Sequence, residues 1–232
     1  MATERDNVFD DALADEYALL YYAYPHHDEF QAEIAKTLVS RLADPDGFVL
    51  EAGAGSGVTT EFLLKASSSM TIIALDSSEK MLEQAEENLA DYAQVVFVLD
   101  DLLACLKQQP DESLDGFVAA WTLHNLLPDY RKELFPEIYR VLKPGGAFVS
   151  GDKYSVADEE QHQAQLLAQL DRFRDFCQTN QVLADDWVKH NLEDETIRIS
   201  EQEQHEILNS LGFSDVRTVY RNDMEAIITA IR

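Results

Sequence analysis

The sequence predicts an α/β fold built on a doubly wound, mostly parallel seven-stranded sheet. Three observations predict it: short apolar runs alternate with amphipathic stretches from residue 48, a glycine-rich segment follows the first run, and acidic residues follow the next two. The 232 residues, 46% of them hydrophobic, suffice for one such core. We expect a single domain over 1–232, with a helical cover (1–46), a core (47–152), a helical insertion (153–199) and a last helix with a terminal hairpin (200–232).

The core is expected to alternate strands with helices. The strands are predicted at Phe48–Ala52, Thr71–Leu75, Val95–Leu99, Gly116–Ala120 and Ala147–Ser150. Continuous apolar runs such as Phe117-Val118-Ala119-Ala120 are typical of parallel strands that are buried on both faces. The helices are predicted at Thr59–Ala66, Ser78–Tyr92, Leu102–Gln108 and Tyr130–Leu142. Ser77 or Ser78 is expected to cap the second of them, and Lys143-Pro144-Gly145-Gly146 to end the fourth.

Helical segments flank this core on both sides. Residues 6–43 show apolar side chains at helical spacing, with a break at Tyr24-Pro25. Residues 157–193 are expected to form one or two inserted helices, and Glu201–Leu211 another. The runs Ser214–Tyr220 and Glu225–Ile231, separated by Arg221-Asn222-Asp223, predict an antiparallel hairpin at the end of the sheet.

The acidic composition narrows the range of partners. Acidic residues number 44 against 18 basic ones, and the resulting net charge of −26 repels nucleic acids and anionic membranes. We therefore expect neither as a partner. The sequence lacks an apolar run of about eighteen residues, so no transmembrane helix is predicted. Its first residues lack the basic and apolar pattern of a secretory signal, and a cytoplasmic location is expected.

Metal binding is not expected. Cys105 and Cys177 lie far apart, without companions at the spacing of a zinc site. His26 and His27 are adjacent, so their side chains point apart, and no further histidine lies near them in the sequence.

The glycine-rich segment Glu51-Ala52-Gly53-Ala54-Gly55-Ser56-Gly57 lies between a strand and a helix, where such a loop lets a ligand approach the backbone. A dinucleotide-binding loop would want a small residue where this chain has Val58. Glu51 would also be an unfavourable neighbour for a pyrophosphate, whereas it would suit an ammonium group. The segment therefore favours a ligand with an amino group over a nicotinamide dinucleotide.

Acidic residues follow the second and third strands. Asp76 lies nineteen residues beyond Gly57, where a carboxylate can accept both hydroxyls of a ribose. The pair Asp100-Asp101 ends the third strand, in a position suited to the exocyclic amine of adenine. An acid near an ammonium, a second at a ribose and a third at adenine together describe S-adenosylmethionine.

With these features the sequence resembles the Rossmann-like, class I S-adenosylmethionine-dependent methyltransferases. The resemblance covers residues 47–152 closely and extends loosely to the terminal hairpin. Five motifs in order carry it: Val49-Leu50-Glu51-Ala52-Gly53-Ala54-Gly55-Ser56-Gly57, Ala74-Leu75-Asp76-Ser77-Ser78-Glu79-Lys80-Met81-Leu82, Val98-Leu99-Asp100-Asp101-Leu102, Leu114-Asp115-Gly116-Phe117-Val118 and Arg140-Val141-Leu142-Lys143-Pro144-Gly145-Gly146.

The resemblance implies S-adenosylmethionine as the cofactor, and it implies which residues bind it. The methionine part would lie against Glu51 and the loop of Gly53, Ala54 and Gly55, and the ribose would bond to Asp76. Adenine would lie beside Ser77 or Met81, with its amine read by Asp101 and the Leu102 amide, or alternatively by Asp100. A further cofactor contact is expected just after the fourth strand, at Trp121.

Methyl transfer requires an acceptor nucleophile in line with the methyl–sulfur bond, and in some cases a base. Candidate catalytic residues are His124, beyond the fourth strand, and Asp152 and Tyr154, beyond the fifth. An aromatic cover over the acceptor is expected from Tyr17, Tyr21, Tyr22 and His26. The expected acceptor is an unidentified small molecule, and a homodimer stays open.

Three alternatives remain at this point. The protein could bind S-adenosylmethionine without catalysis and act through a partner, or it could be a nicotinamide-dependent oxidoreductase. A related enzyme subclass rebuilds the cofactor into a carboxylated form with an arginine near the sulfonium, and Arg172, Arg174 and Arg198 would be candidates for it.

Overall fold

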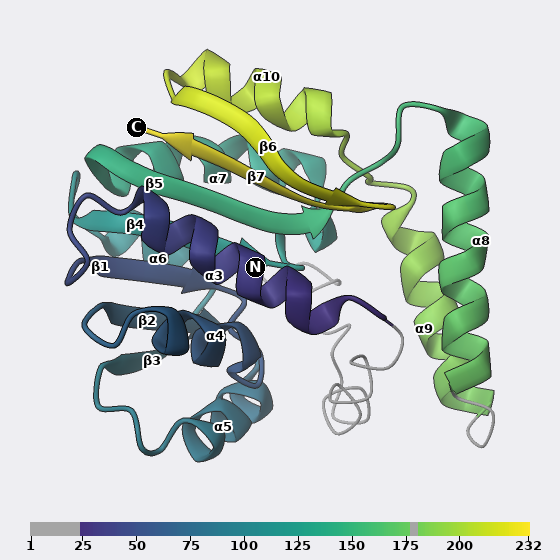
Figure 1. Cartoon of the computed structure of the whole chain (residues 1–232), viewed down its shortest axis with the longest axis horizontal. Helices are drawn as coiled ribbons and strands as arrows, with labels where there is room; N and C mark the ends of the chain where they lie inside the picture. Colours follow the sequence, from purple (N-terminus) through teal and green to yellow (C-terminus); the bar gives the residue numbers. More distant parts are fainter. Residues whose placement is uncertain (1–23, 177–180) are drawn as a thin grey trace.

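The structure, a computed structural model, describes residues 24–176 and 181–232, with side chains described at 24–175 and 185–232. Its centre is a seven-stranded sheet of order β3-β2-β1-β4-β5-β7-β6 (Figure 1). The strands are β1 (Phe48–Ala52), β2 (Thr71–Asp76), β3 (Val95–Leu99), β4 (Leu114–Ala120), β5 (Leu142–Lys153), β6 (Ser214–Asn222) and β7 (Glu225–Ile231). The first five strands pair in parallel and the hairpin pairs antiparallel, so the predicted fold class is confirmed.

The strand order places the ligand edge of the sheet. The order runs outward from β1 through β2 to β3, and from β4 outward in the other direction, so it reverses between β1 and β4. In sheets of this kind the crevice at the carboxyl ends of the strands at such a reversal is where ligands bind. The arrowheads of β1 and β5 point toward the same side of the molecule, where helices α8 and α9 stand (Figure 1).

Helices cover both faces of the sheet. They are α3 (His27–Arg41), α4 (Val58–Ala66), α5 (Glu79–Asn88), α6 (Leu102–Gln108), α7 (Pro128–Val141), α8 (Glu159–Phe176), α9 (Gln181–Asp194) and α10 (Glu201–Leu211), with a short 3-10 turn, η2 (Leu123–Asn125), after β4. Residues of α3 and α4 share one buried cluster with Val49, and residues of α6, α7 and α10 share the other with Leu50. Because successive strand residues face opposite sides, one strand contributes to both cores.

Short-range signals explain where the core helices begin. The Ser78 hydroxyl accepts a hydrogen bond from the Met81 N–H and caps α5, and Asp101 caps α6 in the same way through Ala104. The fourth core helix begins at Pro128, two residues before the predicted start at Tyr130, because the missing N–H of proline suits the first helical position. The pattern of apolar residues alone did not show this.

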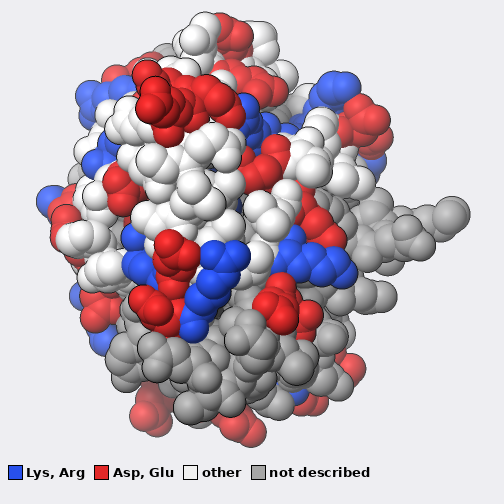
Figure 2. Space-filling view, turned by 90° about the vertical axis from the view of Figure 1, so that its right-hand side faces the viewer, with Lys and Arg blue, Asp and Glu red and all other residues white. Residues whose placement is uncertain are grey.

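The segment predicted to hold one or two helices holds two, α8 and α9, which pack side by side at the ligand edge (Figure 1). The rings of Phe173 and Trp187 stack between them at 5.6 Å. On the face that carries this pair, basic side chains are scattered among acidic ones rather than gathered (Figure 2). None of the described helices is both long and apolar enough to cross a membrane.

Candidate functional site

A cleft opens at the carboxyl ends of β1 to β4, with a volume of about 80 Å³. We call it the strand-end cleft. Six predicted cofactor residues line it, namely Gly53, Asp76, Ser77, Asp100, Asp101 and Leu102. The topology therefore brings together residues that come from three separate strand ends.

Asp76 connects the two sides of this cleft. Its carboxylate accepts the Gly55 N–H at 2.8 Å and the Ser78 N–H at 2.9 Å, so one side chain holds both the glycine loop and the start of α5. Burial raises the pKa of Asp76, and these backbone N–H donors oppose the shift. The chain thus maintains a largely buried acid at the position where the sequence predicted a ribose contact.

Gly53 allows the close approach of β1 to the turn after β4. Its φ is +67°, and a Cβ there would lie 2.4 Å from the Thr122 hydroxyl oxygen. That hydroxyl is held in place because it donates to the carbonyls of Ala52 and Ala120, both at 3.0 Å. Backbone that passes so near a side chain without its own Cβ leaves room for a ligand against the loop.

Gly53→Ala is expected to lower the free energy of unfolding by about 2–4 kcal/mol and to weaken any ligand held by the loop. The matched control is Gly145→Ala, because Gly145 also has a positive φ, +82°, but a Cβ there would meet nothing within 4 Å. The control should lose only the backbone preference, about 1 kcal/mol. Urea unfolding of both variants measures the difference, and equal losses would contradict the role of Thr122.

Glu51 lies behind the loop, at the end of β1, and is 1% exposed. Its Oε2 accepts a 2.6 Å hydrogen bond from Thr60, while its Oε1 is buried with no partner among the described residues. Burial, together with the neighbouring charge of Asp76, raises the pKa of Glu51 to about 8. A buried acceptor without a donor is rare in proteins and fits a site for the ammonium group of a ligand.

Tyr130 and Asp101 form the far wall of the strand-end cleft. The Tyr130 hydroxyl donates to Asp101 Oδ2 and accepts the Leu103 N–H, both at 2.8 Å. The prediction missed Tyr130, Thr122 and Leu126, which also line the cleft. Pro128 was the available signal, because it begins α7 near the carboxyl end of β4 and so brings Tyr130 to this edge.

Some predicted cofactor residues lie elsewhere. Met81 is 3% exposed and does not line the cleft, so of the two residues expected beside adenine only Ser77 is there. Ala54 contributes backbone, donating its N–H to the Leu75 carbonyl at 2.9 Å. Trp121 has φ +48°, and it lines a different cavity.

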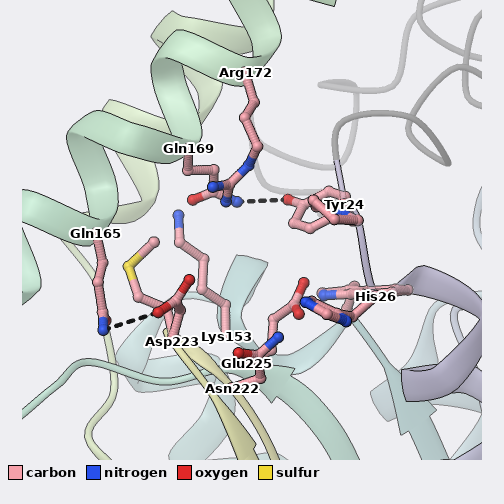
Figure 3. A pocket seen from close by; sticks show the side chains of 12 residues that line it. Tyr24, His26, Lys153, Gln165, Gln169, Arg172, Asn222, Asp223 and Glu225 are labelled. Atoms are coloured by element: carbon pink, nitrogen blue, oxygen red, sulfur yellow. Dashed lines mark hydrogen bonds between the residues drawn. The ribbon is translucent and has the colours of Figure 1, made fainter.

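That second cavity, of about 160 Å³, lies between α8 and the β6–β7 hairpin, and we call it the hairpin cavity (Figure 3). Trp121 lines it and packs against Tyr24, His27 and Phe30, with ring centroids 4.8–5.3 Å apart. His26 also lines it, as predicted for an acceptor residue. The other predicted acceptor residues, Tyr17, Tyr21 and Tyr22, lie outside the described residues.

His124 and Asp152 pair with each other, but away from the hairpin cavity. Asp152 is 1% exposed and accepts from His124 Nδ1, from the Leu123 N–H at 2.8 Å and from the Lys153 N–H at 3.0 Å. The other ring nitrogen of His124 lies 3.7 Å from Asp194 of α9. Both nitrogens of the histidine therefore face carboxylates, within a buried polar cluster that joins α9 to the sheet.

Tyr154 is also buried, and its hydroxyl donates to Ser150 at 3.0 Å. Burial raises its pKa, so the phenol stays protonated. The structure corrects its expected placement near the acceptor: the ring belongs to the core cluster shared with α7 and α10. Among the described residues no group of side chains suited to a metal ion is found.

Asp152→Ala is expected to lower the free energy of unfolding by about 3–5 kcal/mol, because the change leaves the N–H of Leu123 buried without its acceptor and removes the partner of His124. Asp91→Ala, at an exposed aspartate, serves as the control and should change stability by less than about 0.5 kcal/mol. Chemical denaturation compares them, and similar stabilities would exclude an anchoring role for Asp152.

Comparisons with known proteins agree with this geometry. Residues 49–146 match the protein family described as "Methyltransferase domain". The chain belongs to the class I S-adenosylmethionine-dependent methyltransferase family. Those matched residues run from β1 to the turn inside β5, and so include every residue found in the strand-end cleft. The prediction of a methyltransferase family enzyme is confirmed, which sets the oxidoreductase alternative aside.

Several curated relatives are carboxy-S-adenosyl-L-methionine synthases. That of Shewanella woodyi is 32% identical over 123 residues, which span 52% of this chain and 50% of the synthase. That of Campylobacter fetus subsp. fetus is 25% identical over 218 residues, 93% of this chain and 86% of the synthase. The stronger match thus spans about half of the relative it matches.

Solved structures show the same fold. The Burkholderia thailandensis 1,6-didemethyltoxoflavin-N1-methyltransferase, solved with 1,6-didemethyltoxoflavin and S-adenosylhomocysteine, has a TM-score of 0.60 at 18% identity and covers 100% of this chain and 91% of its own. Human N-acetylserotonin methyltransferase has a TM-score of 0.60 at 18% identity and covers 85% of this chain and 51% of its own.

Proposed function

We propose that this protein binds S-adenosylmethionine in the strand-end cleft and transfers its methyl group to a small molecule. The observation that carries the proposal is the unpartnered, buried Oε1 of Glu51 behind a glycine loop that is itself held by Asp76. Bound S-adenosylmethionine supplies an activated methyl group on a sulfonium. Its ammonium would answer the orphaned carboxylate oxygen, and its ribose hydroxyls would bond to Asp76.

The remaining cleft residues would hold the adenine. Ser77 and Leu102 lie on either side of the cleft, and the Asp101 carboxylate, oriented by Tyr130, would accept the exocyclic amine. Asp100 already accepts from Gln108 at 3.1 Å and from the Asp101 N–H at 2.8 Å, which favours Asp101 for this contact.

The acceptor would occupy the hairpin cavity. Trp121 lines that cavity and directly precedes Thr122, which lines the strand-end cleft, so the turn after β4 lies between the two spaces. In-line displacement requires the nucleophile, the methyl carbon and the sulfur to be aligned, and positioning supplies most of the catalysis in such a reaction. Asp152 and His124 would act by fixing η2 and hence this turn, since neither lines the hairpin cavity.

Isothermal titration calorimetry tests the first step. S-adenosylmethionine and S-adenosylhomocysteine should bind with one-to-one stoichiometry and compete for one site, whereas NAD should not bind. Folded protein that binds neither sulfur compound would refute the proposal.

A second candidate function is carboxyl transfer onto the cofactor, by analogy with the curated synthases. It is favoured by the hairpin cavity, which Arg172 and Lys153 line, because two basic side chains can hold a carboxylate there. Mass spectrometry of the ligand that copurifies with the protein distinguishes the two functions. A carboxylated sulfonium compound would favour the synthase, and S-adenosylmethionine or S-adenosylhomocysteine alone would favour the methyltransferase.

A further inference from the structure

Unpartnered polar atoms gather around the hairpin cavity. Among the described residues, Trp121 Nε1 and the Oε1 atoms of Gln165, Gln169 and Glu225 are buried without a hydrogen-bond partner, and all four residues line this one cavity. Buried polar atoms are nearly always paired in folded proteins. Four exceptions around one space indicate a ligand that bonds to them.

Three of these four atoms are acceptors. The assignment at Gln165 is firm, because its Nε2 donates to Asp223 at 3.2 Å and a carboxylate there can only accept. Gln169 directs its Nε2 to the Tyr24 hydroxyl at 2.8 Å, which turns its carbonyl oxygen elsewhere (Figure 3). The ligand must therefore supply several N–H or O–H donors, and the carboxylate of Glu225 favours a positively charged one.

The cavity also carries positive charge at its other side. Arg172 and Gln169 reach down from α8, while Glu225 rises from the hairpin below, beside His26 (Figure 3). Lys153 is 8% exposed, and its ammonium donates to Asn191 at 3.0 Å. The lining thus holds two basic residues, Lys153 and Arg172, and two acidic ones, Asp223 and Glu225, in a chain whose net charge is −26.

A ligand of one sign would leave half of this lining unmatched. An amine alone would not answer Arg172, and a carboxylate alone would not answer Glu225 or the two amide oxygens. We propose that the hairpin cavity recognises a small amino acid, with its amine at Glu225 and the amide oxygens and its carboxylate toward Arg172 and Lys153. This inference rests on the proposed function and names the class of its methyl acceptor.

The environment of Glu225 adds a dependence on pH. Burial raises the pKa of this carboxyl to about 7, and the charge of Arg172 opposes the shift. The charged and titratable groups around it are Lys153, its partner across β5, Arg172 of α8, Asp223 of the turn and His26. Below pH 7 Glu225 takes up a proton and loses its charge, so amine recognition should weaken as the pH falls from 8 to 6.

The test is calorimetry on the protein saturated with S-adenosylhomocysteine. The probes are the amino acids glycine, β-alanine, 4-aminobutanoate and 5-aminopentanoate, each with the carboxylate and the alkylamine of matching length. The best amino acid should bind at least tenfold more tightly than either matching probe, and more weakly at pH 6 than at pH 8. Equal affinity of the carboxylate or of the amine would overturn the inference.

Two variants separate the ends of the ligand. Glu225→Gln should reduce the affinity of the amino acid to that of the carboxylate probe, and Arg172→Gln should reduce it to that of the amine. Glu160→Gln, at an exposed position of α8, is the control and should change neither affinity. Unchanged amino acid affinity in Glu225→Gln would contradict the assignment.

The two levels of the argument can fail separately. If S-adenosylhomocysteine binds and none of the probes does, the acceptor class is wrong and the proposed function stands. If S-adenosylhomocysteine does not bind to the folded protein, the proposed function fails, and this inference fails with it.

Discussion

Replacing Asp76 with alanine is expected to weaken the binding of S-adenosylmethionine at least 100-fold. The side chain has two roles: it would accept the ribose hydroxyls, and it accepts the N–H groups of Gly55 and Ser78 that shape the cleft. Hydrogen bonds to a charged group contribute about 1.5–3 kcal/mol each, and about 1.4 kcal/mol corresponds to a factor of ten in affinity. Losing two of them is enough for the stated effect.

Asp76→Asn is the matched control for this prediction. It has nearly the same shape and keeps one acceptor oxygen, so its affinity should fall between those of the wild type and Asp76→Ala. Calorimetry gives the affinities, and circular dichroism establishes that each variant is folded. A folded Asp76→Ala protein with wild-type affinity would show that the ribose does not lie in the strand-end cleft.

Features that depend on a few neighbouring residues could be predicted from the sequence. The apolar runs of β1 to β5, the cap at Ser78 and the acids at strand ends all follow from local physical chemistry. Parallel topology then brings Asp76 and Asp101 to one edge without further information. This is why six predicted cofactor residues line a single cleft.

Features that depend on contacts between distant segments could not be predicted. The hairpin cavity combines Tyr24, Gln169 and Glu225, which lie on three elements far apart in the sequence. Trp121 was expected at the cofactor, but the left-handed backbone at this residue accompanies its packing against Tyr24 and α3. The sequence could likewise not show that α9 brings Asp194 next to His124 and so encloses the predicted base.

Glu51→Gln is expected to stabilise the ligand-free protein at pH 8 and to weaken cofactor binding. Burial raises the pKa of Glu51 to about 8, above its ordinary value of 4.5. The folded state therefore holds a proton that the unfolded state has already released, so stability falls as the pH rises from about 5 to 8. At about 1.4 kcal/mol for each pH unit, the loss is on the order of 3–5 kcal/mol. Glutamine cannot ionise and would not suffer it.

The same glutamate should favour the cofactor only when it is ionised. An ammonium ligand stabilises the carboxylate, so binding below pH 8 must displace the proton, and the affinity of the wild type should rise with pH up to about 8. Glu51→Gln should show about 10–100-fold weaker binding at pH 8 and a flatter dependence on pH, because its neutral amide attracts the ammonium less.

Two measurements decide the prediction for Glu51. Urea unfolding at pH 6, 7 and 8 gives the stability of the ligand-free proteins, and calorimetry in buffers of different ionisation enthalpy counts the protons released on binding. Glu86→Gln, at an exposed position of α5, should match the wild type in both. The remaining buried acids affect wild type and variant alike, so the difference between the two belongs to Glu51. If that difference does not grow between pH 6 and pH 8, Glu51 is not the protonated acid of the ligand-free site, and the ammonium must bind elsewhere.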